Sequence, residues 1–129
     1  MTNKEIGQLG EELACNYLMK NGFRLLHRNW RLKGRYEIDI VAFKDNALHF
    51  VEVKTRTTPF SDPLRAVNMD KIRHVSRAAY MYKRYFGYSY DTLIDAIGIV
   101  YRGNDDYELH FIPNVHNNLI DYGYQRRYY

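Results

Sequence analysis

The sequence predicts an α/β domain in which a mixed sheet, with elements in the order α-β-β-β-α-β-β, is flanked by helices. Its length of 129 residues corresponds to one domain. Its composition, 46% hydrophobic and 26% charged, is typical of globular proteins and argues against disorder. Two segments repeat apolar residues at helical spacing, and five shorter ones have strand composition. We expect one domain over residues 1–116 and a Tyr/Arg-rich tail over residues 117–129.

The first expected helix runs from about Lys4 to Lys20. Either Thr2 or Asn3 can serve as its N-cap, and Asn21-Gly22 ends it. Its apolar face consists of residues spaced three and four apart, namely Ile6, Leu9, Leu13 and Tyr17. Glu11 falls at the edge of this face beside small residues, so its carboxylate can approach a sheet closely.

Three strands are expected next, at Phe23–Arg28, Glu37–Phe43 and Leu48–Lys54, with residues 29–34 as a loop after the first. The second expected helix covers Met69–Phe86, because Asn68 is a good N-cap and Gly87 follows its last apolar residue. The last two strands are expected at Leu93–Tyr101 and Tyr107–Ile112.

The second and third strands form a hairpin whose register follows from the turn centred on Asp45-Asn46. Val41 should then face Phe50, and Asp39 should lie opposite Glu52. The same face also carries Glu37, Phe43, Leu48 and Lys54. The other face carries Ile38, Ile40, Ala42, His49, Val51 and Val53. We expect His49 to be a satisfied core histidine.

Opposed carboxylates at the end of an apolar face destabilise each other and resist ionisation unless a cation lies between them. Mg²⁺ (or Mn²⁺) fits Asp39 and Glu52, because Mg²⁺ prefers carboxylate oxygens and keeps several waters. Lys54 adds a cation that can orient a metal-bound water or stabilise a phosphate, and the Val53 carbonyl can add a ligand. These residues predict metal-dependent phosphodiester hydrolysis. The alternative is a surface ladder in which Lys54 pairs with Glu37 or Glu52.

Nucleic acid is the expected partner, because the net charge is +4, the pI is about 9.1 and there are 13 tyrosines. The candidate contacts near Asp39 are Arg28, Trp30, Arg31, Lys33 and Arg35. Lys71 can reach the site or a phosphate, or can cover the core with its aliphatic part. On the second helix, Arg73, Arg77 and Arg84, with Tyr80 beside them, can follow a phosphate backbone or form a solvated face. The tail can bind single strands, dock on a partner subunit or be disordered.

Several other classes lack support in the sequence. It contains no apolar run of about 18 residues and no signal peptide, so we expect a cytoplasmic protein that binds no membrane. The single Cys15 excludes an intrachain disulfide and a cysteine-based zinc site. A glycine-rich phosphate loop and a serine nucleophile elbow are also absent from the sequence.

Ile38-Asp39, followed by Glu52-Val53-Lys54, resembles the P-D-(D/E)-x-K nuclease signature. More specifically, the chain resembles the YraN family, uncharacterised bacterial proteins of the Holliday-junction-resolvase-like group. The resemblance covers about residues 7–115 and includes these motifs: Gly10-Glu11, Arg28-Asn29, Glu37-Ile38-Asp39, Phe50-Val51-Glu52-Val53-Lys54 with Arg56, Ala66-Val67 with Lys71, and Asp95. One departure is Tyr36, where the family usually has glycine.

The resemblance implies a restriction-endonuclease-like fold, with Glu11, Asp39 and Glu52 as acidic site residues and Lys54 as the catalytic lysine. It also adds Arg56 to the expected nucleic-acid contacts. The expected function is that of a metal-dependent endonuclease acting on nucleic acid. The first candidate substrate is DNA, including branched DNA. A homodimer is compatible with this, because two strands must be cut. The alternatives are a nucleic-acid-binding module that does not cleave, and an interaction protein that oligomerises through its tail.

Overall fold

A computed structural model describes residues 1–60 and 68–115, and the tail over residues 117–129 lies outside the described residues. The elements, in chain order, are α1 (Asn3–Lys20), β1 (Arg24–Leu32), β2 (Tyr36–Lys44), β3 (Ala47–Arg56), α2 (Met69–Phe86), β4 (Asp91–Gly103) and β5 (Asp106–Ile112). The predicted order and fold class are confirmed. No helix in the described part of the chain has the length and apolar character needed to cross a membrane.

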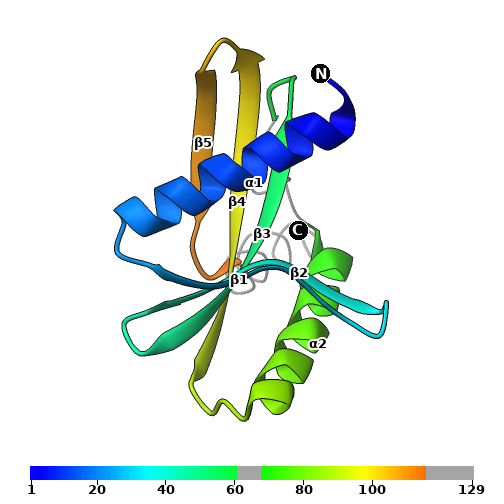
Figure 1. Cartoon of the computed structure of the whole chain (residues 1–129), viewed down its shortest axis with the longest axis vertical. Coiled ribbons are helices and arrows are strands. Elements are labelled where there is room, and N and C mark those ends of the chain that lie inside the picture. Colours follow the sequence, from blue (N-terminus) through cyan, green and yellow to red (C-terminus); the bar gives the residue numbers. More distant parts are fainter. Residues whose placement is uncertain (61–67, 116–129) are drawn as a thin grey trace, which may run out of the picture.

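The five strands form one sheet in the order β1-β2-β3-β4-β5. β3 and β4 are parallel, and the other neighbours are antiparallel, so the sheet is mixed. The long connection that a parallel pair requires contains α2. The two helices cover opposite faces of the sheet (Figure 1), and each face has its own apolar cluster.

α1 begins at a capping box, in which the Thr2 hydroxyl accepts from the Glu5 amide and the Glu5 carboxylate accepts from the Thr2 amide. This decides between the two predicted N-caps in favour of Thr2. The helix packs closely on β3 at Gly10, where a methyl group would overlap the Thr55 hydroxyl. Gly7, one turn earlier, has open space around it.

Gly10→Ala is therefore expected to destabilise the fold by about 1–3 kcal/mol, because the added methyl group overpacks the contact between α1 and β3. Gly7→Ala is the matched control and should stabilise by about 0.5–1 kcal/mol through helix propensity alone. Urea unfolding of both variants checks this. Equal effects of the two substitutions would contradict the close packing at Gly10.

β1 is longer than predicted, because residues 29–32 belong to the strand rather than to a loop. Trp30 pairs with Ile38 of β2 and is buried, and its ring packs edge-on against Tyr82, with centroids 5.2 Å apart. Asn29 has a φ of +51°, a conformation that asparagine tolerates. An asparagine at such a position is typical of loops, which is why the sequence predicts a loop here. Burial of the indole outweighs this local signal.

The side-chain alternation predicted for β2 is interrupted at Asp39. Ile38 packs in the cluster under α2, whereas Ile40 packs in the cluster under α1. The prediction that these two isoleucines share a face is therefore wrong. The interruption lies opposite Asn29, whose positive φ turns the neighbouring strand in the same place.

α2 begins and ends where the sequence predicts, with Asn68 as N-cap and Gly87 at a φ of +71°. Tyr82, one turn before the end of the helix, is fully buried, and its hydroxyl lies 2.7 Å from His27 Nδ1. Burial raises the pKa of Tyr82 to about 12. Phe86, the last apolar residue of the helix, is 37% exposed, because it lies in the last turn.

Candidate metal and catalytic site

Asp39 and Glu52 come together where the pairing of β2 with β3 ends. The register Val41–Phe50 and Phe43–Leu48 is as predicted, and the paired residues stop at Ile40–Val51. Beyond that point, Asp39 Oδ2 accepts a hydrogen bond of 2.9 Å from the Val53 amide. A side-chain carboxylate thus takes the place of a backbone acceptor and fixes Asp39 beside the next residue of the facing strand, Glu52.

The surroundings of the two carboxyl groups raise the pKa of both. Burial, followed by the charge of Asp39, raises the pKa of Glu52 to about 7. Burial also raises the pKa of Asp39, although its hydrogen bond from the Val53 amide acts in the opposite direction. Glu52 is 8% exposed, so solvent does little to separate the two charges. Such a pair binds a proton or a cation readily.

Lys71, from the first turn of α2, is the cation that the structure places against this pair. Its Nζ lies 3.2 Å from Glu52 Oε1. Burial lowers the pKa of Lys71, but Glu52 and then Asp39 raise it by more, so the ammonium stays charged. Of the two positions that the sequence left open for Lys71, the structure shows the one that reaches the site.

Lys54 differs from Lys71 in its contacts. Its side chain is exposed and makes no ion pair with any residue that the structure describes. It lines a hollow of about 470 Å³ at the start of α1, together with Gly7 and Arg56. The ion pair with Glu52 is made by Lys71 in this structure, and the placing of Lys54 with the two carboxylates stays a prediction.

Glu11 is close enough to Asp39 to sense its charge. Burial, and then Asp39, raise the pKa of Glu11, while the Asn29 side chain lowers it. Its Oε1 is buried and has no hydrogen-bond partner among the described residues. Yet within residues 1–60 and 68–115, no three acidic, histidine or cysteine side chains form a ready metal cage. Glu11 thus lies near the pair with one carboxylate oxygen that has no described partner, and its part in a metal site stays a prediction.

The basic residues predicted to contact nucleic acid are exposed and spread along β1 and its turn. Arg28 pairs with Glu12 at 3.0 Å, and Arg31 lies 4.0 Å from Glu37. The remaining exposed cations of this group are Lys33, Arg35 and Arg56. Trp30 does not join them, because its ring is 8% exposed and forms part of the core. The expectation that this indole stacks on bases is corrected accordingly.

Raised carboxyl pKa values predict an unusual pH dependence for the metal-free protein. In the unfolded chain Glu52 titrates near its ordinary value of 4.5, whereas in the folded protein it titrates at about 7. Folding is therefore favoured as the pH falls from 7 toward 4.5, and ionised Glu52 costs roughly 2–3 kcal/mol at pH 8. Glu52→Gln should recover roughly 1–2 kcal/mol of stability at pH 8 and almost none at pH 5.

Thermal unfolding in a chelator at the two pH values measures this effect. Glu37→Gln, an exposed glutamate on the neighbouring strand, is the matched control and should change stability by less than about 0.5 kcal/mol at both. A Glu52→Gln variant less stable than the wild type at pH 8 would show that the ion pair with Lys71 dominates instead.

The fold and site together define an α/β domain, compatible with a restriction-endonuclease-like fold, that carries a buried carboxylate pair at the end of a hairpin. The model of the uncharacterised protein family UPF0102 matches residues 10–99. The chain belongs to this family, the YraN family that its motifs resemble.

Relatives from distant bacteria support the assignment. A UPF0102 protein of Bacteroides thetaiotaomicron is 43% identical over 99 residues, 76% of this chain and 81% of the relative. One from Leifsonia xyli is 37% identical over 113 residues, 86% of this chain and 95% of the relative. One from Syntrophomonas wolfei is 48% identical over 82 residues, 62% of this chain and 70% of the relative.

Proposed function

We propose that this protein is a cytoplasmic, metal-dependent endonuclease that hydrolyses the phosphodiester bonds of nucleic acid. The first candidate substrate is DNA, including branched DNA. The observation that carries the proposal is the buried pair of Asp39 and Glu52, whose pKa values are both raised. Keeping two carboxylates buried side by side costs free energy. A cation bound by both would explain why the protein keeps them there. A purely structural role would be filled better by apolar residues.

The donor set fits Mg²⁺ or Mn²⁺, since both take carboxylate and carbonyl oxygens and tolerate bound water. Asp39 and Glu52 would hold the ion, with the Val53 carbonyl as a further ligand. Glu11, whose buried Oε1 has no described partner, would add a ligand or a base. When bound, such an ion polarises the phosphate and lowers the pKa of its water.

The lysines then have separate tasks. Lys71 neutralises Glu52 until a cation is bound and is then free to contact a phosphate. Lys54, the catalytic lysine that the resemblance implies, is exposed on β3 two residues beyond Glu52 and would stabilise charge on the scissile phosphate or orient the attacking water. Substrate is expected along the exposed cations of β1, its turn and Arg56.

A digestion panel tests the proposal. Linear, nicked, flapped and four-way DNA, and an RNA of matched sequence, are incubated with the protein in Mg²⁺, in Mn²⁺ or in a chelator. We expect cleavage of at least one substrate with either metal, none in the chelator, and a lower rate for Lys54→Ala. Absence of cleavage of every substrate under both metals would overturn the proposal.

One observation favours a second candidate, a nucleic-acid-binding module that does not cleave. The 3.2 Å pair between Lys71 and Glu52 supplies the acidic site with an internal cation. Calorimetry separates the two candidates. An endonuclease should bind Mg²⁺ or Mn²⁺ in a way that depends on Asp39, whereas a binding module should show salt-dependent association with DNA and no metal binding.

A further inference from the structure

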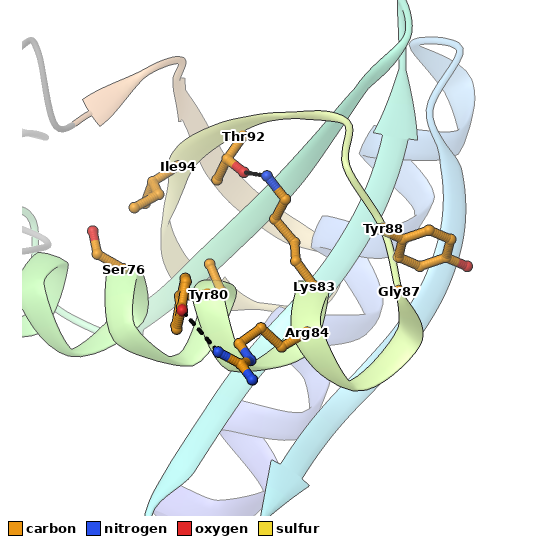
Figure 2. Close-up of a pocket in the computed structure, with 9 residues that line it drawn as sticks. Ser76, Tyr80, Lys83, Arg84, Gly87, Tyr88, Thr92 and Ile94 are labelled. Carbon is orange, nitrogen blue, oxygen red and sulfur yellow. Dashed lines mark hydrogen bonds between the residues drawn. The ribbon is translucent and has the colours of Figure 1, made fainter.

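A second hollow lies at the other end of α2, between its last three turns and the start of β4 (Figure 2). Its volume is about 500 Å³. Its lining residues are Ser76, Ala79, Tyr80, Lys83, Arg84, Gly87, Tyr88, Thr92 and Ile94. Lys71 and Arg84 are 13 positions apart on α2, so at the helical rise per residue Arg84 lies about 20 Å along the helix from the lysine that contacts Glu52.

The charges of this hollow are positive and uncompensated. Lys83 Nζ donates to the Thr92 hydroxyl at 2.9 Å, and an Arg84 nitrogen donates to the Tyr80 hydroxyl at 3.1 Å, as Figure 2 shows. Both acceptors are neutral. Neither cation forms an ion pair with a residue in the described part of the chain, and none of the lining residues is acidic. The hollow is therefore suited to an anion.

An aromatic ring and an apolar wall accompany the two cations. Tyr80 is 58% exposed, and the Arg84 guanidinium lies 5.8 Å from the centroid of its ring. Ala79 and Ile94 are buried behind it. A stackable ring next to uncompensated cations is the combination that binds a base and its phosphate together.

We propose that this hollow binds one nucleotide of a single-stranded segment of nucleic acid, with its phosphate on Lys83 and Arg84 and its base against Tyr80. A duplex keeps its bases stacked inside, so only an unpaired nucleotide can present a base to this ring. The inference rests on the proposed function and deepens it, because a strand running along α2 from Lys71 would occupy both sites. The substrate class that follows is DNA with a single-stranded portion.

Fluorescence anisotropy with a labelled single-stranded oligonucleotide, in a chelator so that no cleavage occurs, tests the contact with the base. Tyr80→Ala should weaken binding about tenfold, as expected for the loss of one stacked base. Tyr80→Phe should bind within about twofold of the wild type, since the ring is kept. The matched control is Tyr85→Ala, an equally exposed tyrosine on α2 outside the hollow. An unaffected Tyr80→Ala, or an equal loss for Tyr85→Ala, would overturn the inference.

The contact with the phosphate has its own pair of variants. Lys83→Ala should weaken binding several-fold and make the salt dependence shallower by about one unit. Lys20→Ala, which removes the same charge from the last turn of α1 on the other face of the sheet, should change neither. Equal losses in both variants would mean general attraction by net charge and would refute a local site.

Two further comparisons separate this inference from binding of free nucleotides and from the proposed function. Adenosine monophosphate should compete with the oligonucleotide only weakly, and competition at equal affinity would assign the hollow to free nucleotides instead. Binding through Tyr80 without cleavage of any substrate would refute the proposed function and leave this inference standing. Cleavage of a substrate, together with no effect of the Tyr80 and Lys83 substitutions on strand binding, would refute this inference and leave the proposed function standing.

Discussion

Asp39→Asn is expected to lower metal-dependent cleavage by about 10²–10³-fold, the loss that follows when several kcal/mol of metal-assisted stabilisation is removed. Asparagine keeps an oxygen that can accept from the Val53 amide, so the end of the hairpin should remain folded. What disappears is the negative charge that a divalent cation needs. The same variant should show no heat of Mg²⁺ binding at concentrations that saturate the wild type.

Glu37→Gln is the control for this experiment, because it removes one negative charge from the same strand at an exposed position. It should cleave at close to the wild-type rate. Thermal unfolding confirms that both variants are folded before their rates are compared. Cleavage by Asp39→Asn at the rate of the wild type would contradict the assignment of Asp39 as a ligand.

Asp95→Ala is expected to cost about 3–5 kcal/mol of stability, the largest effect of any single substitution considered for this fold. Asp95 is 1% exposed and accepts from two sides. Its Oδ2 lies 2.6 Å from His49 Nδ1, and its Oδ1 accepts from the Asn114 amide at 2.8 Å. Alanine would leave the buried His49 and the half-buried Asn114 amide without this acceptor, which is the costly case.

Urea unfolding measures this cost, and Asp91→Ala is the matched control at the exposed start of the same strand. The control should stay within about 0.5 kcal/mol of the wild type. A loss below about 1 kcal/mol for Asp95→Ala would mean that water reaches His49 and replaces the carboxylate.

The hairpin shows how much of this site can be predicted from sequence. A turn centred on Asp45-Asn46 suffices to align Val41 with Phe50, and it predicts that Asp39 lies near Glu52. Asp39 itself lies beyond the last paired residues, where the hydrogen bond from the Val53 amide holds it. The prediction that His49 is satisfied in the core is confirmed in the same way, because its strand face is apolar. These are consequences of local geometry, in which neighbours in sequence fix neighbours in space.

The predictions that failed depend on contacts between distant segments. Trp30 looks like part of a basic loop until Tyr82, from the other half of the chain, covers its ring. Ile38 changes sides because the neighbouring strand turns at Asn29, which alternation within one strand cannot anticipate. Lys71 is a different case, because the sequence left two positions open for it. It reaches Glu52 because α2 packs against the end of the hairpin, and spacing along a helix does not fix that direction.

The hydrogen bond between Asp39 and the Val53 amide gives the protein a built-in reporter. Whatever changes the charge on that carboxylate, whether a proton, a metal ion or a substrate phosphate, must also alter the shielding of a single backbone proton. The nitrogen–proton correlation signal of Val53 should therefore track occupancy of the centre directly. It would do so even under conditions in which no product is formed.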